Sequence, residues 1–271
     1  MKTNFPESFI PDKAFLFKGV PVYFTDRGSG PAVVLLHGFL ESKEIWNDFA
    51  EALASTNRVL CIDLPGHGKT GCLSYVHSME LMAEAVYLIV KKLRIKRCKL
   101  VGHSMGGYVA LAFAEANPEM VTGLCLFHST ARADTEPKKT DRNRAIQVVK
   151  KNPSLFIKEV IPNLFYTTKQ KPLKRLIAKT IAIALKTPKQ GIIAALEGMK
   201  IRLERELIIR FAPYPVLFII GKQDKIIPYE GLFEQAALPE NSKTVVVNCG
   251  HMGFYEAPEK TLAAVEEFVK E

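Results

Sequence analysis

A serine lies at the centre of residues 102–107, whose sequence Gly-His-Ser-Met-Gly-Gly contains the pattern Gly-x-Ser-x-Gly. The hexapeptide follows a short, mainly apolar run at residues 99–101 and precedes a helical stretch at residues 108–117, which is the strand–turn–helix context that the pattern needs. A turn of this kind holds its central residue in a strained backbone conformation, at a cost of about 1–3 kcal/mol. The pattern therefore predicts that Ser104 is a nucleophile whose hydroxyl stands clear of the sheet.

Two later loops carry residues that would activate this serine, because a serine hydroxyl is a weak nucleophile without a neighbouring base. Asp224 follows the apolar strand predicted at residues 216–220, and His251 follows the strand predicted at residues 244–247. An acid and then a histidine, each at the carboxyl end of a strand, come in the chain order that this serine topology requires. We predict that His251 takes the proton of Ser104 and later delivers it to the leaving group, while Asp224 fixes the imidazole tautomer.

Two backbone N–H groups are predicted to bind the negatively charged oxygen of a tetrahedral intermediate. One belongs to Met105, which follows the nucleophile, and the other belongs to Phe39, in the loop after the buried strand predicted at residues 31–36. Gly38 gives this loop room to turn its amide inward. The adjacent His37 is predicted to have a structural role.

Several other residues could take part in chemistry, and each also has a simpler structural interpretation. His128 comes directly after a buried strand and Met252 is adjacent to the predicted base, so both are candidate contacts in a substrate pocket, although packing explains His128 equally well. His67 and His103 are predicted to be structural, and no metal site is expected because no partner histidine lies near His67 in the sequence. Cys249 is predicted to be a buried thiol, since a serine already occupies the nucleophile position.

The elements that must position these residues alternate between strands and helices. Continuous apolar runs predict strands, and apolar residues at helical spacing predict the helices between them. Ser78 is predicted to cap one of these helices, and Pro258 is predicted to open the last one. Such alternation is typical of a mostly parallel sheet with helices on both faces, so we predict an α/β fold. The strands are predicted at residues 14–17, 20–25, 31–36, 58–63, 99–101, 121–127, 216–220 and 244–247.

The alternation stops at residues 129–211, which carry almost no strand signal and consist of helical pieces separated by prolines. We predict that this segment is a helical cap, or lid, inserted into a core formed by residues 1–128 and 212–271. The cap would cover the carboxyl ends of the strands, where open α/β sheets bind their ligands.

The net charge of +9 is concentrated in one part of the chain. Residues 128–211 contain 19 Lys and Arg against 7 Asp and Glu, which leaves the remainder of the chain slightly acidic. No nucleic-acid-binding motif accompanies these charges, so nucleic acid is not expected as a partner. Three interpretations of the basic cap stay open: a solvated face, attraction of an anionic substrate, and adsorption to anionic lipid.

The bulk composition is that of an ordinary globular protein, and 271 residues suffice for one large α/β domain or two small ones. The first residues lack the apolar segment of a signal peptide, and no apolar run reaches the ~18 residues of a membrane span. The five cysteines are scattered without a Cys-x-x-Cys pair, so we predict reduced, mostly buried thiols in a cytoplasmic protein.

Together these motifs resemble those of the α/β-hydrolase superfamily. The resemblance rests on residues 37–39, on Asp-Leu-Pro-Gly-His-Gly at 63–68, on the serine motif at 102–107, on the Asp224 loop and on Gly-His at 250–251. It implies an eight-stranded sheet whose second strand is antiparallel, with a helical cap inserted in the core. Within the superfamily the chain resembles small cofactor-free esterases, enol-lactonases and carbon–carbon bond hydrolases.

Two positions distinguish this chain within the superfamily. Many members have a proline two positions after the histidine, where this chain has Gly253, and that departure is expected to loosen the loop. Dehalogenases and epoxide hydrolases use an aspartate nucleophile, so Ser104 argues against both reactions.

The sequence therefore predicts a serine hydrolase that cleaves a small carboxylic ester or lactone through an acyl-enzyme, with no metal ion and no organic cofactor. Its partner would be a small acyl substrate, and the chain would act as a monomer or a homodimer. Two alternatives stay open: a hydrolase of carbon–carbon bonds in diketo acids, and a ligand receptor that keeps an intact triad.

Overall fold

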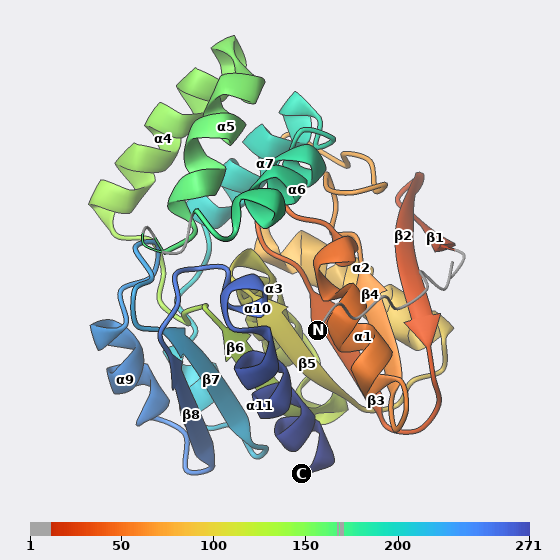
Figure 1. Ribbon diagram of the computed structural model, residues 1–271. Coiled ribbons are helices and arrows are strands. Elements are labelled where there is room, and N and C mark those ends of the chain that lie inside the picture. The colour runs from red at the N-terminus through yellow and green to blue at the C-terminus, as the bar shows by residue number, and fades with distance from the viewer. Residues whose placement is uncertain (1–11, 167, 169–170) are drawn as a thin grey trace.

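Buried apolar runs form the strands of a central sheet, as expected for strands that are covered on both faces. The computed structural model describes residues 12–166, 168 and 171–271. Within these residues the strands form one eight-stranded sheet with the order β1-β2-β4-β3-β5-β6-β7-β8 (Figure 1). The strands are β1 (Lys13–Phe17), β2 (Val20–Arg27), β3 (Ala32–Leu36), β4 (Arg58–Ile62), β5 (Cys98–His103), β6 (Val121–Phe127), β7 (Val216–Gly221) and β8 (Ser242–Val247).

The pairing of the strands confirms the predicted fold class. From β4 to β8 every neighbouring pair in the sheet is parallel, whereas β2 pairs antiparallel with both β1 and β4. The second strand is thus antiparallel, as the family resemblance implied. All parallel strands end at the same edge of the sheet, so the loops that follow β3, β5, β6, β7 and β8 meet there.

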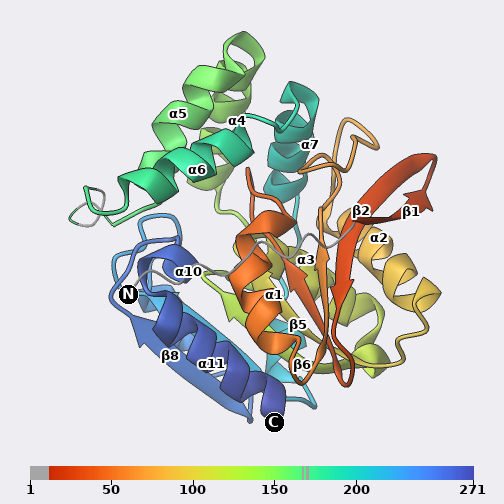
Figure 2. The ribbon, with the colours of Figure 1, turned by 45° about the vertical axis from the view of Figure 1, so that its right-hand side comes forward.

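Helices cover both faces of this sheet, with α1 and α11 on one face and α2 and α3 on the other (Figures 1 and 2). Helix α2 begins where the sequence predicted, because the side chain of Ser78 accepts a hydrogen bond from the Leu81 amide and satisfies a free N–H of the first turn. The elements of this part are η1 (Lys43–Trp46), α1 (Asn47–Leu53), α2 (Met79–Lys92), α3 (Met105–Ala116), η2 (Pro118–Met120), α9 (Glu230–Ala236), α10 (Gly253–Glu256) and α11 (Pro258–Lys270).

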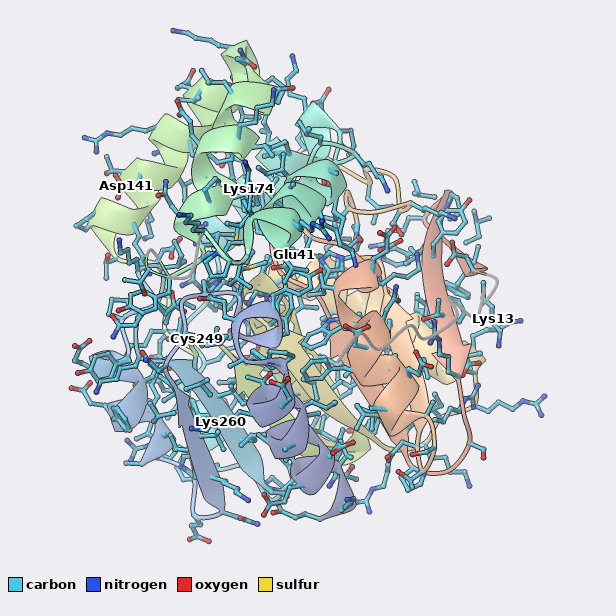
Figure 3. All side chains as sticks on the ribbon, viewed as in Figure 1. Lys13, Glu41, Asp141, Lys174, Cys249 and Lys260 are labelled. Carbon is cyan, nitrogen blue, oxygen red and sulfur yellow. The ribbon has the colours of Figure 1, made fainter. Side chains whose placement is uncertain are left out.

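A helical insertion, residues 129–211, separates β6 from β7. Its helices α4, α5, α6 and α7 pack on one another and stand beyond the carboxyl ends of the strands (Figure 1). Lys174 is one of the charged residues on this insertion, and Glu41 lies near the level at which the insertion meets the rest of the chain (Figure 3). The helices are α4 (Glu136–Lys151), α5 (Pro153–Asn163), α6 (Lys174–Ala184), α7 (Lys189–Lys200) and α8 (Glu206–Arg210).

Buried charges hold the insertion together and attach it to the core. Within the insertion, Asp134, whose side chain is fully buried, pairs with Arg142 of α4 and with Arg202, which follows α7. The guanidinium of Arg202 also lies 4.1 Å from the centre of the Tyr108 ring on α3. Arg205, 2% exposed, pairs with acidic side chains of α2 and α3. Because Arg205 is buried, loss of its acidic partners would leave its charge uncompensated, so this contact attaches the insertion to α2 and α3.

The cysteines match the prediction of reduced thiols. All five lie in the described part of the chain, where none forms a disulfide, and four of them are buried in the sheet or its loops. Among the helices that the structure describes, none is both long enough and apolar enough to cross a membrane.

The packing of α3 on β3 yields a test of the fold. A Cβ added at Gly106 would lie 2.2 Å from the carbonyl oxygen of Leu36, which is backbone and cannot move aside. We expect Gly106→Ala to lower the free energy of unfolding by about 1–3 kcal/mol in urea denaturation, because the helix must shift off the strand. Gly231→Ala in α9 is the control, since its Cβ would meet nothing closer than 3.4 Å, and alanine there should stabilise by about 0.5–1 kcal/mol. A Gly106→Ala protein as stable as the wild type would contradict this account of the packing.

Candidate active site

The turn between β5 and α3 holds Ser104 in a strained conformation. Its φ of 49° and ψ of −115° lie in a region that side chains disfavour. Two hydrogen bonds keep it there: the Ser104 amide donates to the Phe127 carbonyl at 3.0 Å, and the Ser129 hydroxyl donates to the Ser104 carbonyl at 2.8 Å. The sequence prediction of a strained turn with a serine at its apex is thus met in the backbone geometry.

The structure brings together the three side chains predicted as nucleophile, base and acid. The Oγ of Ser104 lies 2.9 Å from Nε2 of His251, and Nδ1 of the same ring lies 2.7 Å from Oδ2 of Asp224. A carboxylate can only accept, so Nδ1 carries a proton, and Nε2 is left as the acceptor of the serine O–H. This is the geometry in which a histidine can take a proton from a serine.

Asp224 is held ionised although it is almost fully buried. Burial alone would raise the pKa of this carboxyl, but the charge and hydrogen bond of His251 and the amide of Ile226 together lower it to about 2. Its Oδ1 accepts hydrogen bonds from the amides of Ile226 and Ile227, at 2.8 and 3.1 Å. The acid is therefore fixed in charge and in orientation before any substrate arrives.

Two backbone amides near Ser104 are the candidates for binding an oxyanion, one at the start of α3 and one in the loop after β3. Met105 is the first residue of α3, so its N–H has no acceptor within the helix. Within the part of the chain that the structure describes, the Phe39 amide likewise donates to no other residue. His37 has the structural place predicted for it, because its Nε2 accepts the Leu64 amide at 2.9 Å and it is fully buried. The oxyanion-binding role of the two free amides stays a prediction.

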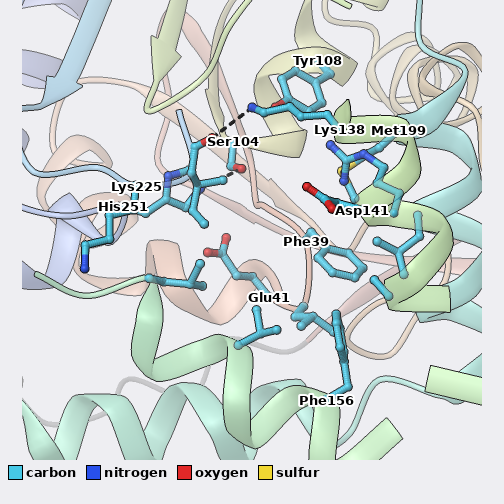
Figure 4. Close-up of a pocket in the computed structure, with 17 residues that line it drawn as sticks. Phe39, Glu41, Ser104, Tyr108, Lys138, Asp141, Phe156, Met199, Lys225 and His251 are labelled. Carbon is cyan, nitrogen blue, oxygen red and sulfur yellow. Dashed lines mark hydrogen bonds between the residues drawn. The ribbon is translucent and has the colours of Figure 1, made fainter. Parts of the chain in front are cut away.

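A cavity of about 330 Å³ opens above Ser104, between the core and the insertion (Figure 4). That volume suits a small organic ligand. One side of the cavity comes from the loops after β3, β5, β7 and β8, and the other from α4, α5 and α7. Its walls are mostly apolar and are formed in part by Phe39, Leu40, Tyr108, Ala145, Phe156, Val160, Leu164, Leu196 and Met199.

Five charged residues also line the cavity, and the sequence analysis singled out none of them. The only signal in the sequence was the spacing of Lys138 and Arg142, which are four residues apart and therefore lie on one face of α4. The spacing of residues on α4 does not reveal which face of the helix packs toward the serine. The five are Lys138, Asp141, Arg142, Glu41 and Lys225.

His128 and Met252 do not lie where the sequence analysis expected them. Both are fully buried, and neither is among the described residues that line the cavity. His128 lies behind the acid, with Nδ1 3.7 Å from Oδ2 of Asp224, and its backbone has a φ of 46°. Burial lowers the pKa of His128 to about 3, so the ring is neutral. Met252 packs in the apolar core beneath the loop.

The donor chemistry of a metal site is missing from the described residues. Among them no group of three or more His, Cys, Asp or Glu side chains is arranged to hold a metal ion. His67 and His103, predicted to be structural, are both fully buried, and the pKa of His67 is lowered by burial to about 3. Cys249 is buried as predicted.

Comparison with known proteins places these features in a family context. A family model described as "alpha/beta hydrolase fold" matches residues 31–258. The chain is 27% identical over 277 residues to the human (Homo sapiens) monoacylglycerol lipase ABHD6, a match that covers 94% of this chain and 78% of that protein. It is 26% identical over 258 residues to a 2-hydroxy-6-oxononadienedioate/2-hydroxy-6-oxononatrienedioate hydrolase of a Pseudomonas species, covering 92% of this chain and 91% of that protein.

Solved structures with the same fold include esterases and a lactonase. A thermophilic esterase from Thermogutta terrifontis, determined with malate bound, superposes with a TM-score of 0.90 at 30% identity, covering 96% of this chain and 98% of that one. An enol-lactonase from Burkholderia xenovorans LB400 superposes with a TM-score of 0.89 at 20% identity, covering 96% of this chain and all of that one. At that identity the lactonase supports the fold alone.

The strain at the nucleophile can be measured directly. Ser104→Ala removes the hydroxyl but keeps a Cβ, whereas Ser104→Gly removes both and frees the backbone. We expect Ser104→Gly to be more stable than Ser104→Ala by about 1 kcal/mol in urea denaturation, because the released strain exceeds the entropic cost of glycine. Equal stability of the two variants would mean that the turn carries no strain.

Proposed function

The chain belongs to the α/β-hydrolase fold family, and from that premise we propose that it is a serine hydrolase that cleaves a small carboxylic ester or lactone through an acyl-enzyme. The observation that carries the proposal is the continuous hydrogen-bonded line from the Ser104 hydroxyl through His251 to Asp224. A serine with a base in contact, and a base with a fixed tautomer, is the arrangement that activates a hydroxyl for attack.

In the proposed acylation, Oγ of Ser104 forms a bond to the substrate carbonyl carbon while its proton passes to Nε2 of His251. The carbonyl oxygen becomes an oxyanion, held by the amides of Phe39 and Met105. The imidazolium then returns the proton to the leaving alkoxide as the carbon–oxygen bond breaks. Asp224 stays ionised throughout and stabilises the imidazolium.

In the proposed deacylation, a water molecule gives its proton to Nε2 of His251 and attacks the acyl carbon. The second tetrahedral intermediate uses the same two amides, and its collapse returns the proton to Ser104. We propose that residues 129–211 act as a cap in this cycle, because they supply the far wall of the cavity and limit the access of bulk water to the acyl-enzyme.

The comparisons support this reaction class and leave room for a second one. The 30%-identical esterase supports ester cleavage, and the Pseudomonas relative is named as the hydrolase of dienedioate and trienedioate substrates. A hydrolase of carbon–carbon bonds in diketo acids is therefore the second candidate, and a receptor with an intact triad is the third. The p-nitrophenyl esters of acetate and butyrate, assayed against a vinylogous diketo acid, separate the first two. Labelling by a fluorophosphonate without multiple turnover would favour the receptor.

The triad proposal predicts a specific pattern of loss. Ser104→Ala and His251→Ala should each lower kcat/KM for p-nitrophenyl butyrate by about 10³-fold or more, because they remove the nucleophile or the base. Asp224→Ala should cause a smaller loss, because the acid only orients and stabilises the imidazole. Wild-type protein should react with a fluorophosphonate and Ser104→Ala should not. Full esterase activity in Ser104→Ala would refute the assignment.

The charges of the cavity favour an anionic acyl group. Lys138, half-buried on α4, extends across the cavity toward Ser104 (Figure 4). In the described part of the chain its ammonium has one hydrogen-bond acceptor, the Ile226 carbonyl at 3.0 Å, and no carboxylate within ion-pair distance. By contrast, the neighbouring Arg142 already pairs with Asp134, a carboxylate that it shares with Arg202. Burial lowers the pKa of Lys138, and an anion in the cavity would raise it again by stabilising the ammonium.

We therefore expect Lys138→Met to reduce kcat/KM for mono-p-nitrophenyl succinate about tenfold and to leave p-nitrophenyl butyrate nearly unchanged, because the two acyl groups differ only by the carboxylate. Lys139→Met is the matched control, since that ammonium pairs with Glu136 and is absent from the cavity wall. High salt should weaken the preference for succinate. An equal loss on both esters would show that Lys138 supports the cavity without binding an anion.

A further inference from the structure

A buried carboxylate and a buried imidazole face each other beside the triad. Glu41, 2% exposed, follows the loop that carries Phe39, and His103, fully buried, directly precedes Ser104. Their nearest atoms, Oε2 of Glu41 and Nδ1 of His103, are 3.0 Å apart. The two residues are 62 positions apart in the sequence, so this contact joins the loop after β3 to the turn after β5.

Each partner makes one further hydrogen bond to a backbone group. Oε2 of Glu41 accepts the amide of Gly38 at 2.5 Å, which fixes the peptide between His37 and Gly38, one peptide before the one that carries the Phe39 amide. Nε2 of His103 lies 2.9 Å from the carbonyl oxygen of His251, the predicted general base. One side-chain pair thus links the three loops that carry the nucleophile, the base and a free amide.

These contacts determine the charge on His103. A carbonyl oxygen can only accept, so Nε2 must carry a proton to bond to the His251 backbone. Oε2 of Glu41 already accepts an N–H, and an ionised carboxylate there takes a second hydrogen from Nδ1. With both ring nitrogens donating, His103 is an imidazolium and Glu41 its carboxylate partner.

The surroundings agree with this assignment. Burial would lower the pKa of His103, but the charge and hydrogen bond of Glu41, the His251 carbonyl and the more distant Asp224 raise it above its ordinary value. Burial would likewise raise the pKa of Glu41, and the charge of His103 together with the Gly38 amide lowers it. The pair is thus ionised on both sides.

Among the described residues, the other groups that face the pair include no second carboxylate in contact with His103. The rings of His251 and His128 lie 5.0 and 6.1 Å from the His103 ring, centre to centre, and Phe127 and Phe254 pack against it edge-on. On the other side of the pair, the electrostatic effect of His37 helps to lower the pKa of Glu41. Burial and the Glu41 carboxylate raise the pKa of Tyr255. Of the titratable groups near His103, Glu41 is the one in direct contact.

We propose that Glu41 and an imidazolium at His103 form a positioning pair that holds the amide-bearing loop and the general base in register with Ser104. The inference rests on the proposed hydrolase function and assigns neither residue a contact with the reacting atoms. An apolar pair of similar volume would avoid the desolvation cost of two buried charges but could not donate to the His251 carbonyl and accept from the Gly38 amide at once.

The pair also gives the reaction an alkaline limit. At high pH His103 loses one of its two ring N–H donors. The hydrogen bond to either the His251 carbonyl or Glu41 is then lost, because that acceptor faces the lone pair of an unprotonated ring nitrogen. Removing the Glu41 charge lowers the pKa of His103, so in such a variant the same loss occurs at lower pH.

The test compares Glu41→Gln with Glu44→Gln. Glu44 lies in η1, three residues further along, with a half-exposed side chain 3.9 Å from Lys186, and serves as a control for the same chemical change. Active sites are counted with a fluorophosphonate before p-nitrophenyl butyrate turnover is measured from pH 5 to 10. We expect Glu41→Gln to lower kcat per active site about 10- to 100-fold with little change in KM, and to move the alkaline limb to lower pH.

A purely structural role predicts a different result for Glu41→Gln. Fewer sites would then react with the fluorophosphonate, and the remaining sites would turn over with wild-type kcat and pH profile. That outcome would overturn the proposal, as would a control variant with the same loss as Glu41→Gln.

A second measurement needs neither a substrate nor a folded variant at position 41. In wild-type protein labelled with ¹⁵N-histidine, both ring nitrogens of His103 should show the chemical shifts of a protonated imidazole at pH 7, the signal being assigned by its loss in His103→Gln. A neutral His103 at pH 7 would overturn the proposal even if Ser104-dependent turnover were intact. Failure of the hydrolase function would instead appear as absent turnover in wild-type protein whose His103 is charged.

Discussion

The close approach of helix α3 to strands β3 and β5 is the constraint on which the site depends. A Cβ at Gly102 would lie 2.4 Å from the carbonyl oxygen of Gly106, and a Cβ at Gly106 would lie 2.2 Å from that of Leu36. With strand and helix this close, a single residue must reverse the chain, and Ser104 does so with a positive φ. The strain and the exposed hydroxyl are thus two consequences of one packing arrangement.

Behind the serine, imidazoles are kept in different charge states by what each contacts. His103 meets the carboxylate of Glu41 and is charged, whereas His128 is neutral with a pKa of about 3. A Cβ at Gly253 would lie 2.3 Å from Nε2 of His128, which explains why proline is absent at this position. The expectation that Gly253 loosens the loop stays a prediction; Gly253 begins α10, and its carbonyl accepts the Ala257 amide at 2.9 Å. The glycine makes room for a buried ring.

The sequence was sufficient to predict those site residues whose positions follow from local motifs and from the order of the strands. Ser104, Asp224 and His251 each follow a strand, and parallel strands bring their carboxyl ends to one edge, so local pattern and topology suffice to bring them together. Glu41 and His103 could not be paired this way, since their contact depends on side-chain directions across 62 residues. His128 and Met252 follow strands too, and strand position alone did not reveal that both point into the core.

The insertion was the least predictable part of the chain, and hydrogen bonds tie it to the loops that carry the acid and the base. The amide of His251 donates to the carbonyl of Leu164 at 2.7 Å, and Lys138 donates to the carbonyl of Ile226, two residues beyond Asp224. Charge counts could not identify these contacts, because 19 basic residues lie in residues 128–211 and packing decides which of them faces the cavity. The segments that shape the cavity therefore also hold the acid and base loops. Any displacement of the end of α5 from the core must break the Leu164 bond, so cavity shape and base position change together.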